Sequence, residues 1–262
     1  METVVSADGT RIAFERLGEG PPVVVVGGAT CDRTVTRPLA ERLARRFTVI
    51  NYDRRGRGDS GDTTPYAVER EVEDIAALIV AAGGTAFVYG HSSGAALALH
   101  AAARGLPVGR LVLHEPPFSP GGERGRAMRE TADEVGKLLA EDRRDDALAL
   151  HLSMTGMPPE AVREMRHQSW WAGWAAKAVT LPYDYAVLDE AGRGGVTPAE
   201  QARGVSAPTL VVCGGASPAW LLDGDRRVAD ALPDGRYVLL AGQEHIVPPE
   251  VLVPVLAEFF AG

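Results

Sequence analysis

The segment Gly90–Gly94 reads GHSSG and places a serine two residues from a glycine on each side. This G-x-S-x-G spacing is typical of a nucleophile elbow when a strand precedes it and a helix follows, because so sharp a turn has no room for side chains beside the serine. At such a turn the Ser92 hydroxyl is accessible to both a base and a substrate. A serine hydroxyl is a weak nucleophile at neutral pH, so the chemistry also needs a general base.

The surrounding pattern predicts the strand and the helix that this motif requires. Val23–Val26 is a continuous β-branched run with no polar face, which favours a strand covered on both sides. Ala86–Tyr89 and Leu111–Leu113 are also predicted as buried strands, and the small-residue helix Gly94–Ala103 is predicted directly after the serine. With a further helix predicted at Pro38–Arg46, the alternation of strands and helices predicts an α/β fold with a doubly wound, mostly parallel sheet.

The alternation stops after Pro116-Pro117, and the chain from there to about residue 202 has an amphipathic helical pattern without strong strands. Thr209–Val212 then resumes the sheet. We therefore predict a core of residues 1–117 and 203–262, interrupted by a helical lid at 118–202.

Composition excludes several classes of protein. The 262 residues carry 27 Lys+Arg against 35 Asp+Glu, a net charge of −8, and nucleic-acid binding would need clustered cations. No long apolar stretch predicts a membrane helix, and METVVSADGTRIAF has no signal-peptide pattern. We read Cys31 and Cys213 as reduced thiols, which favours a cytoplasmic protein. No zinc-type motif or phosphate-binding loop is present, so we predict no metal and no cofactor.

The chain resembles the α/β-hydrolases, and specifically their lidded branch with a serine nucleophile. Besides the elbow, Asp53–Ser60 is similar to the D-x-R-G-x-G-x-S turn that many lidded members carry. The resemblance covers nearly the whole length and implies the chain order nucleophile, acid, histidine. Among the six histidines only His245, after the last predicted strand, fits that order.

The acid of the implied triad is displaced. Residues 208–218 resemble the family pattern P-T-L-x-x-x-G-x-x-D-P, but Ser217 stands where the aspartate belongs. Some members place the acid one strand earlier, just before the lid, and Glu115 is the carboxylate at that point. We therefore predict a Ser92–His245–Glu115 triad, with Asp223 and Asp225 as competing acids.

The resemblance also implies an oxyanion hole made by the backbone N–H groups of Ala29 and Ser93. For substrate binding we select Trp170, Trp174 and Tyr183 from a larger group of lid side chains. These side chains either pack as helix contacts or line an apolar pocket above Ser92, and both roles can hold at once. The group comprises Met154, Met157, Met165, Trp170, Trp171, Trp174, Tyr183 and Tyr185.

Three functions remain open from the sequence. The first is a serine hydrolase for a small, mostly apolar ester, thioester or lactone. The second is a non-hydrolytic enzyme of bacterial secondary metabolism that uses the same pocket for cyclisation, dehydration or carbon–carbon bond chemistry. The third is a ligand receptor without catalysis. All three bind a small molecule, and the sequence does not fix the oligomeric state.

Overall fold

The computed structural model describes residues 1–118, 121–189 and 195–262. Its centre is an eight-stranded sheet with the spatial order β1-β2-β4-β3-β5-β6-β7-β8. Strands β1, β2 and β4 pair antiparallel, and every other neighbouring pair is parallel. The strands are β1 (Glu2–Val5), β2 (Arg11–Leu17), β3 (Pro22–Val26), β4 (Thr48–Tyr52), β5 (Ala86–His91), β6 (Val108–His114), β7 (Thr209–Gly214) and β8 (Gly235–Leu240).

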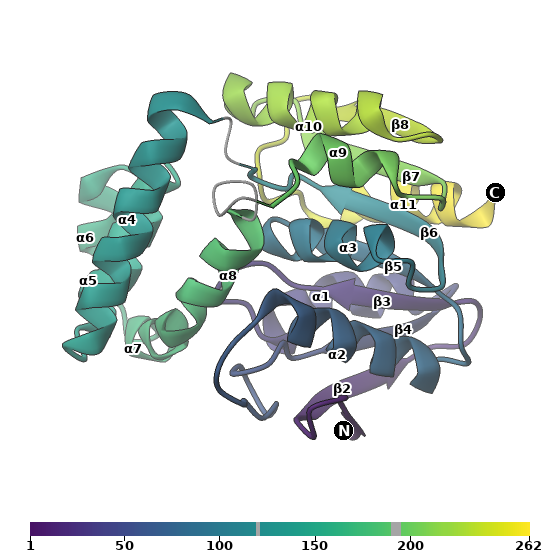
Figure 1. Cartoon of the computed structure of the whole chain (residues 1–262), viewed down its shortest axis with the longest axis horizontal. Helices are drawn as coiled ribbons and strands as arrows, with labels where there is room; N and C mark the ends of the chain where they lie inside the picture. Colours follow the sequence, from purple (N-terminus) through teal and green to yellow (C-terminus); the bar gives the residue numbers. More distant parts are fainter. Residues whose placement is uncertain (119–120, 190–194) are drawn as a thin grey trace.

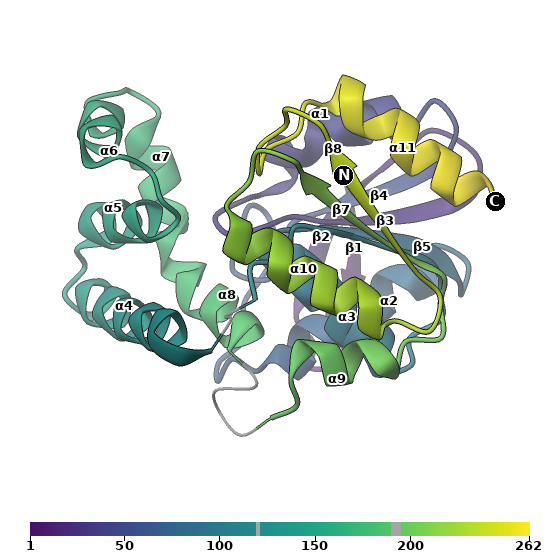
Figure 2. The ribbon, with the colours of Figure 1, turned by 90° about the horizontal axis from the view of Figure 1, so that it is seen from above.

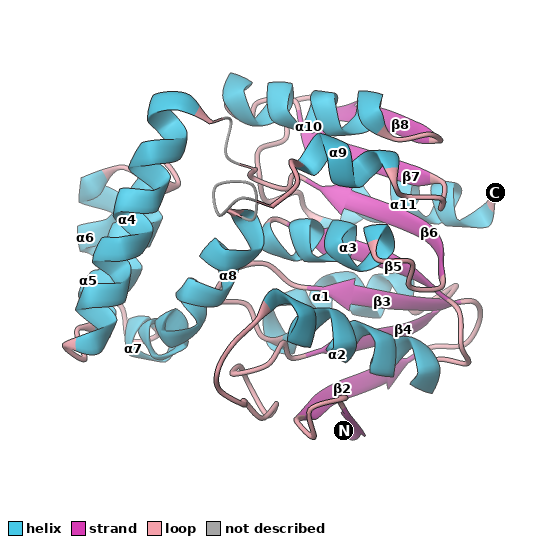
Figure 3. Cartoon of the chain, viewed as in Figure 1, coloured by secondary structure: helices cyan, strands magenta, loops and turns pink. Residues whose placement is uncertain are grey.

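Helices cover both faces of the sheet, as Figure 2 shows from above. Helices α1 and α11 lie on one face, and α2, α3, α9 and α10 lie on the other (Figures 1 and 3). Their bounds are α1 (Arg33–Leu43), α2 (Val68–Ala81), α3 (Ser93–Ala103), α9 (Pro198–Arg203), α10 (Ala219–Ala231) and α11 (Pro249–Ala261). Val23–Val26 is fully buried between the two layers, as a strand without a polar face must be. The predicted doubly wound sheet is therefore confirmed.

Helix α1 differs from its prediction. It begins at Arg33 rather than Pro38, because the Asp32 side chain accepts a hydrogen bond from the Thr34 amide and caps the helix five residues earlier. It ends at Leu43, so that Pro38 lies inside the helix.

Between β6 and β7 the chain forms further helices that stand beside the sheet (Figure 1). They share a separate apolar core, which includes Val135, Leu148, Trp171 and Tyr185. Helix α8 connects this helical layer to the sheet layer, since it contacts both α4 and α3. The bounds are α4 (Gly122–Ala140), α5 (Arg144–Met154), α6 (Pro159–Arg166), α7 (Trp171–Ala175), the 3-10 helix η1 (Ala176–Thr180) and α8 (Leu181–Leu188).

The end of the predicted lid falls at a different place in the structure. Helix α9 packs against α3 and α10, and Ala202 and Val205 belong to the core cluster of the sheet. We therefore assign α9 to the sheet layer, because its apolar side is buried there. Residues 119–120 and 190–194, which the predicted insertion includes, lie outside the described residues.

Candidate active site

Ser92 lies at the turn between β5 and α3. Its backbone has φ +56° and ψ −127°, a conformation that L-residues rarely adopt. A Cβ atom on Gly90 would lie 2.4 Å from the Gly94 carbonyl oxygen, and one on Gly94 would lie 2.4 Å from that of Val26. Only glycine fits at either position, which is the steric reason for the motif's spacing.

His245 follows β8 and forms a hydrogen-bonded pair with Glu115, which follows β6. The distance from Nδ1 of the imidazole to Oε2 of the carboxylate is 2.6 Å. Glu115 is fully buried, and its Oε1 accepts hydrogen bonds from the Gly214 amide at 2.6 Å and the Ser217 hydroxyl at 2.7 Å. Burial alone would raise the pKa of this carboxyl, but the hydrogen bonds outweigh it and hold the pKa below its ordinary value.

The imidazole Nδ1 is bonded to Glu115 rather than to either of the two competing acids. Asp225 is buried on α10, where it accepts a hydrogen bond from the Cys213 thiol at 3.1 Å. Burial raises the pKa of Asp225 well above its ordinary value, which favours the neutral form. Asp223 is exposed on the same helix. The geometry therefore favours Glu115 as the partner of His245.

Two neutral histidines pack beside this pair. The His91 ring lies 4.7 Å from the rings of both His114 and His245, and its Nε2 is 3.1 Å from the His245 carbonyl oxygen. Burial lowers the pKa of His91 to about 3. Because the ring is neutral, it can donate to the His245 carbonyl without adding positive charge beside the base.

Ser92 and His245 share the wall of one cavity of about 620 Å³. The sheet side contributes residues from loops and from the start of α10, and the other side comes from α4, α5, α8 and the segment after α5. Apolar side chains dominate both sides. The lining comprises Ala29, Ser92, Ser93, Pro117, Arg124, Met128, His151, Met154, Thr155, Gly156, Met157, Pro158, Asp184, Tyr185, Leu188, Ala216, Ser217, Pro218, Trp220, Leu221, Glu244, His245 and Ile246.

Ala29 and Ser93 also line this cavity. Ser93 is the first residue of α3, so its amide has no partner within the helix. The loop before Ala29 lies directly against the elbow, since a Cβ on Gly28 would be 3.0 Å from that of Ser92. The structure thus brings both proposed oxyanion donors to the same cavity as the serine.

The three residues predicted to bind substrate lie outside the cavity lining. Trp170 is 49% exposed, and the Trp174 indole donates to the Thr30 hydroxyl at 2.8 Å. Tyr183 stacks on Tyr66 and donates its hydroxyl to Asp62 at 2.7 Å. For Tyr183 the reason is helical geometry: on α8 it points about 140° away from Leu188, which faces the cavity.

Other side chains, from both the sheet layer and the helical layer, line the cavity. Tyr185, one turn from Leu188 on α8, lines the cavity, and its hydroxyl lies 3.0 Å from Nδ1 of His151. Met154 and Met157 belong to the group selected from the sequence, whereas Met128, Trp220 and Ile246 were missed. Arg124 stacks over the Trp220 ring at 3.9 Å. The periodicity of the helix that carries Met128 would have indicated this residue. Trp220 and Ile246 reach the cavity through tertiary contacts, which the sequence does not show.

The sheet topology and an elbow serine near a histidine define an α/β-hydrolase. The chain belongs to this family: its residues 23–253 match the model described as the alpha/beta hydrolase family. A solved alpha/beta hydrolase from Sphaerobacter thermophilus is 52% identical, with a TM-score of 0.88 over 99% of this chain and 100% of that one. The protein is therefore an α/β-hydrolase enzyme.

Two curated relatives have named activities. The 2-(acetamidomethylene)succinate hydrolase of Mesorhizobium japonicum is 30% identical over 250 residues, which cover 92% of this chain and 88% of that protein. The N-formylmaleamate deformylase of Pseudomonas putida is 39% identical over 125 residues, 46% of this chain and 47% of that enzyme. The chain thus aligns with about half of the deformylase's length.

Two features are absent from the described residues. In residues 1–118, 121–189 and 195–262, no helix is both long and apolar enough to cross a membrane. The same part of the chain holds no group of three or more His, Cys, Asp or Glu side chains placed to bind a metal ion.

Proposed function

We propose that the protein hydrolyses a small, mostly apolar ester, thioester or lactone through an acyl-enzyme, with Ser92, His245 and Glu115 as the triad. The observation that carries this proposal is the 2.6 Å contact between the buried Glu115 carboxylate and Nδ1 of His245. A carboxylate on Nδ1 fixes the proton there and leaves Nε2 free to accept the serine proton. The strained turn at Ser92 and the shared cavity support the same assignment.

In the first half of the reaction, Ser92 Oγ forms a bond to the substrate carbonyl carbon while its proton moves to Nε2 of His245. The carbonyl oxygen becomes an oxyanion, which the amides of Ala29 and Ser93 stabilise. The bond to the leaving group then breaks, and His245 returns the proton to that group. Glu115 stabilises the imidazolium during this step.

In the second half, a water molecule gives a proton to His245 and adds to the acyl carbon. The ester bond to Ser92 breaks, the serine regains its proton and the carboxylic acid leaves. We propose that the helices α4–α7 act as the lid over this cavity, because α4, α5 and the segment leading to α6 line it and all four helices share one apolar core.

Ser92→Ala tests the proposal. The wild-type enzyme should react with a fluorophosphonate probe and turn over p-nitrophenyl butyrate, whereas the variant should lose the label and about 10⁶-fold in kcat. Full turnover by the variant would exclude the serine mechanism. Unlabelled wild-type enzyme that converts a metabolite without adding water would favour the non-hydrolytic alternative, and binding without turnover would favour a receptor.

A second candidate is hydrolysis of an N-acyl amide that carries a carboxylate. The names of both curated relatives describe acylated nitrogen compounds with carboxylate groups. In this chain, Arg124 in the cavity wall supplies a cation that can bind a substrate carboxylate. If this candidate holds, Arg124→Gln should raise KM for an anionic N-acyl substrate by about tenfold and leave that for p-nitrophenyl butyrate unchanged.

A further inference from the structure

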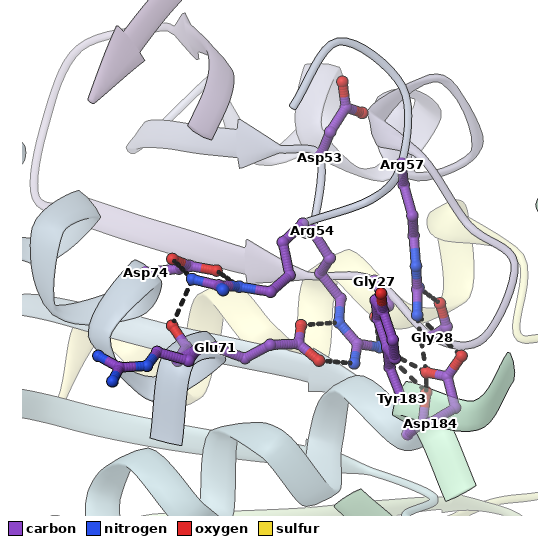
Figure 4. A network of polar contacts seen from close by, with 12 residues as sticks. Gly27, Gly28, Asp53, Arg54, Arg57, Glu71, Asp74, Tyr183 and Asp184 are labelled. Atoms are coloured by element: carbon purple, nitrogen blue, oxygen red, sulfur yellow. Dashed lines mark hydrogen bonds and ion pairs between the residues drawn. The ribbon is translucent and has the colours of Figure 1, made fainter. Parts of the chain in front are cut away.

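A group of buried charges lies beside Gly27 and Gly28 (Figure 4). We call the segment Gly27–Ala29, which carries the proposed oxyanion donor Ala29, the oxyanion loop. We call Arg54, Arg57, Glu71 and Asp184 the buried charge cluster. Both arginines come from the turn after β4, Glu71 comes from α2 and Asp184 from α8, and each side chain is at most 2% exposed. Figure 4 shows the four side chains converging beside Gly27 and Gly28. Two cations and two anions balance here, as burial of charge requires.

Asp184 accepts hydrogen bonds from three side chains. Arg57 Nη2 donates to both carboxylate oxygens at 2.9 and 2.8 Å, Arg54 Nη1 donates at 2.7 Å, and the Ser93 hydroxyl donates at 2.7 Å. Burial would raise the pKa of Asp184, but the arginines and Ser93 lower it to about 2. The group is therefore an anion at every pH at which the enzyme would work.

The arginines also bind the loop that precedes Ala29. Arg57 Nη1 donates to the Gly28 carbonyl oxygen at 2.6 Å, and Arg54 Nη1 donates to that of Gly27 at 3.3 Å. A trans peptide is planar, with its C=O and N–H pointing in opposite directions. The bond to the Gly28 carbonyl therefore also fixes the direction of the Ala29 N–H, which points away from Arg57.

From these contacts we propose that Asp184 is a positioning residue that aligns both oxyanion donors. It holds Ser93 directly, and it holds the Gly28–Ala29 peptide through Arg57. A helix of the insertion thus completes a catalytic device whose donors lie in the sheet layer. This inference rests on the proposed hydrolase mechanism, since it assigns the two amides the role of oxyanion donors.

A neighbouring ion pair, Arg55 with Asp74, provides a control that distinguishes positioning of the oxyanion donors from general support of the fold. Arg55, in the same turn, pairs with the buried Asp74 of α2 through two hydrogen bonds at 2.7 and 2.8 Å. The remaining bonds of Arg55 go to Asp8 and to the Arg70 carbonyl, away from the oxyanion loop. Asp74 is therefore a matched buried carboxylate that stabilises the same turn without contact to either donor.

The experiment compares Asp184→Asn with Asp74→Asn. Asparagine keeps the shape but loses the charge that binds both arginines and Ser93. With p-nitrophenyl butyrate, D184N should lower kcat at least about tenfold and change KM less than about threefold, because the oxyanion exists only in the transition state. Phenylboronic acid, whose tetrahedral adduct places an oxygen between the donors, should bind more weakly by the same factor as kcat/KM falls. D74N should keep the wild-type kcat.

Three outcomes would overturn the inference, and a fourth would reject the proposed function. Wild-type kcat and boronate affinity in D184N would overturn the inference, as would equal losses of kcat in D184N and D74N. If D184N does not fold, the Ser93→Ala variant tests the inference instead, because it removes only the hydroxyl that Asp184 holds. Its kcat should fall about threefold or more at constant KM. An unchanged kcat in Ser93→Ala would overturn the inference. A wild-type enzyme without fluorophosphonate labelling would instead reject the proposed function itself.

Discussion

The two sides of the cavity are built in different ways. On the sheet side, Ser92 is held by backbone strain, and the buried carboxylate of Glu115 fixes His245 and is itself held by two further hydrogen bonds. On the helical side, Met128, Met154 and Met157 meet the cavity with side chains that have no polar partner to fix them. Long thioether chains change rotamer at little cost, so they adapt to the shape of a ligand.

This difference teaches where specificity and chemistry reside. Reacting atoms must be placed to within fractions of an ångström, which needs strained backbone and several hydrogen bonds for each group. The body of a substrate needs only apolar contact area, which several side-chain arrangements can supply. The sheet side, together with Asp184 that is bonded to it, should therefore respond to substitution with large losses of kcat, and the apolar side chains of the helical side with small changes in KM.

After Ser92→Ala itself, the largest effect is expected from Glu115→Gln, on the sheet side. A glutamine amide would donate to Nδ1 of His245, which moves the imidazole proton to Nε2, the nitrogen that must accept the proton of Ser92. We expect kcat to fall by roughly 10³- to 10⁴-fold with KM nearly unchanged. Kinetics with p-nitrophenyl butyrate, together with a circular dichroism spectrum to verify folding, measure this loss.

A second substitution sharpens that test. The Ser217 hydroxyl already lies 2.7 Å from Glu115 Oε1, at the position where the family pattern carries an aspartate. Adding Ser217→Asp to Glu115→Gln should restore kcat about tenfold or more, because a carboxylate again reaches the imidazole. A Glu115→Gln variant with wild-type kcat would show that the carboxylate does not orient the base.

The contrast between the two sides of the cavity also explains which features the sequence could predict. The spacing of Gly90–Gly94 is a local steric requirement, and the serine at 217 removed the usual acid, so that Glu115 became the next candidate. Local patterns also located the strands, although Asp32 capped α1 earlier than Pro38 indicated.

The helical side was harder to predict because it depends on rotation and on long-range contacts. A shift of two residues along α8 separates Tyr183, which binds Asp62, from Tyr185, which faces the cavity. The bond between Arg57 and Asp184 joins residues 127 positions apart, and no spacing rule connects them. Sequence patterns therefore indicate the nucleophile more readily than the pocket.

A smaller effect is expected on the pH dependence of the free energy of unfolding, through one histidine on each side of the cavity. Burial lowers the pKa of His91, on the sheet side, to about 3 and that of His151, on the helical side, to about 4. An unfolded histidine binds its proton below pH of about 6.5, so between that value and the folded pKa the unfolded state holds more protons and stability falls as pH falls. Between pH 6.5 and pH 5, each of these two histidines should lower the free energy of unfolding by up to roughly 2 kcal/mol.

Urea unfolding of His151→Gln at pH 7 and pH 5 measures the contribution of the helical side. The variant should lose less stability than wild type over this interval, because His91 still titrates but residue 151 does not. His167→Gln is the matched control, since His167 is exposed in the same insertion, and it should keep the wild-type dependence. Equal pH dependence in wild type and His151→Gln would contradict burial of a neutral imidazole at this position.

The smallest effect is expected from Met154→Ala on the helical side. The substitution removes apolar contact from the cavity without touching the proposed triad, so kcat should stay within about twofold. KM for p-nitrophenyl hexanoate should rise about fivefold, the equivalent of about 1 kcal/mol, while KM for the acetate ester should not change. Met165→Ala is the control, because Met165 packs on the core of the insertion rather than lining the cavity. A loss of kcat as large as that of Glu115→Gln would remove the distinction between the two sides, since it would mean that the methionines also position the reacting atoms.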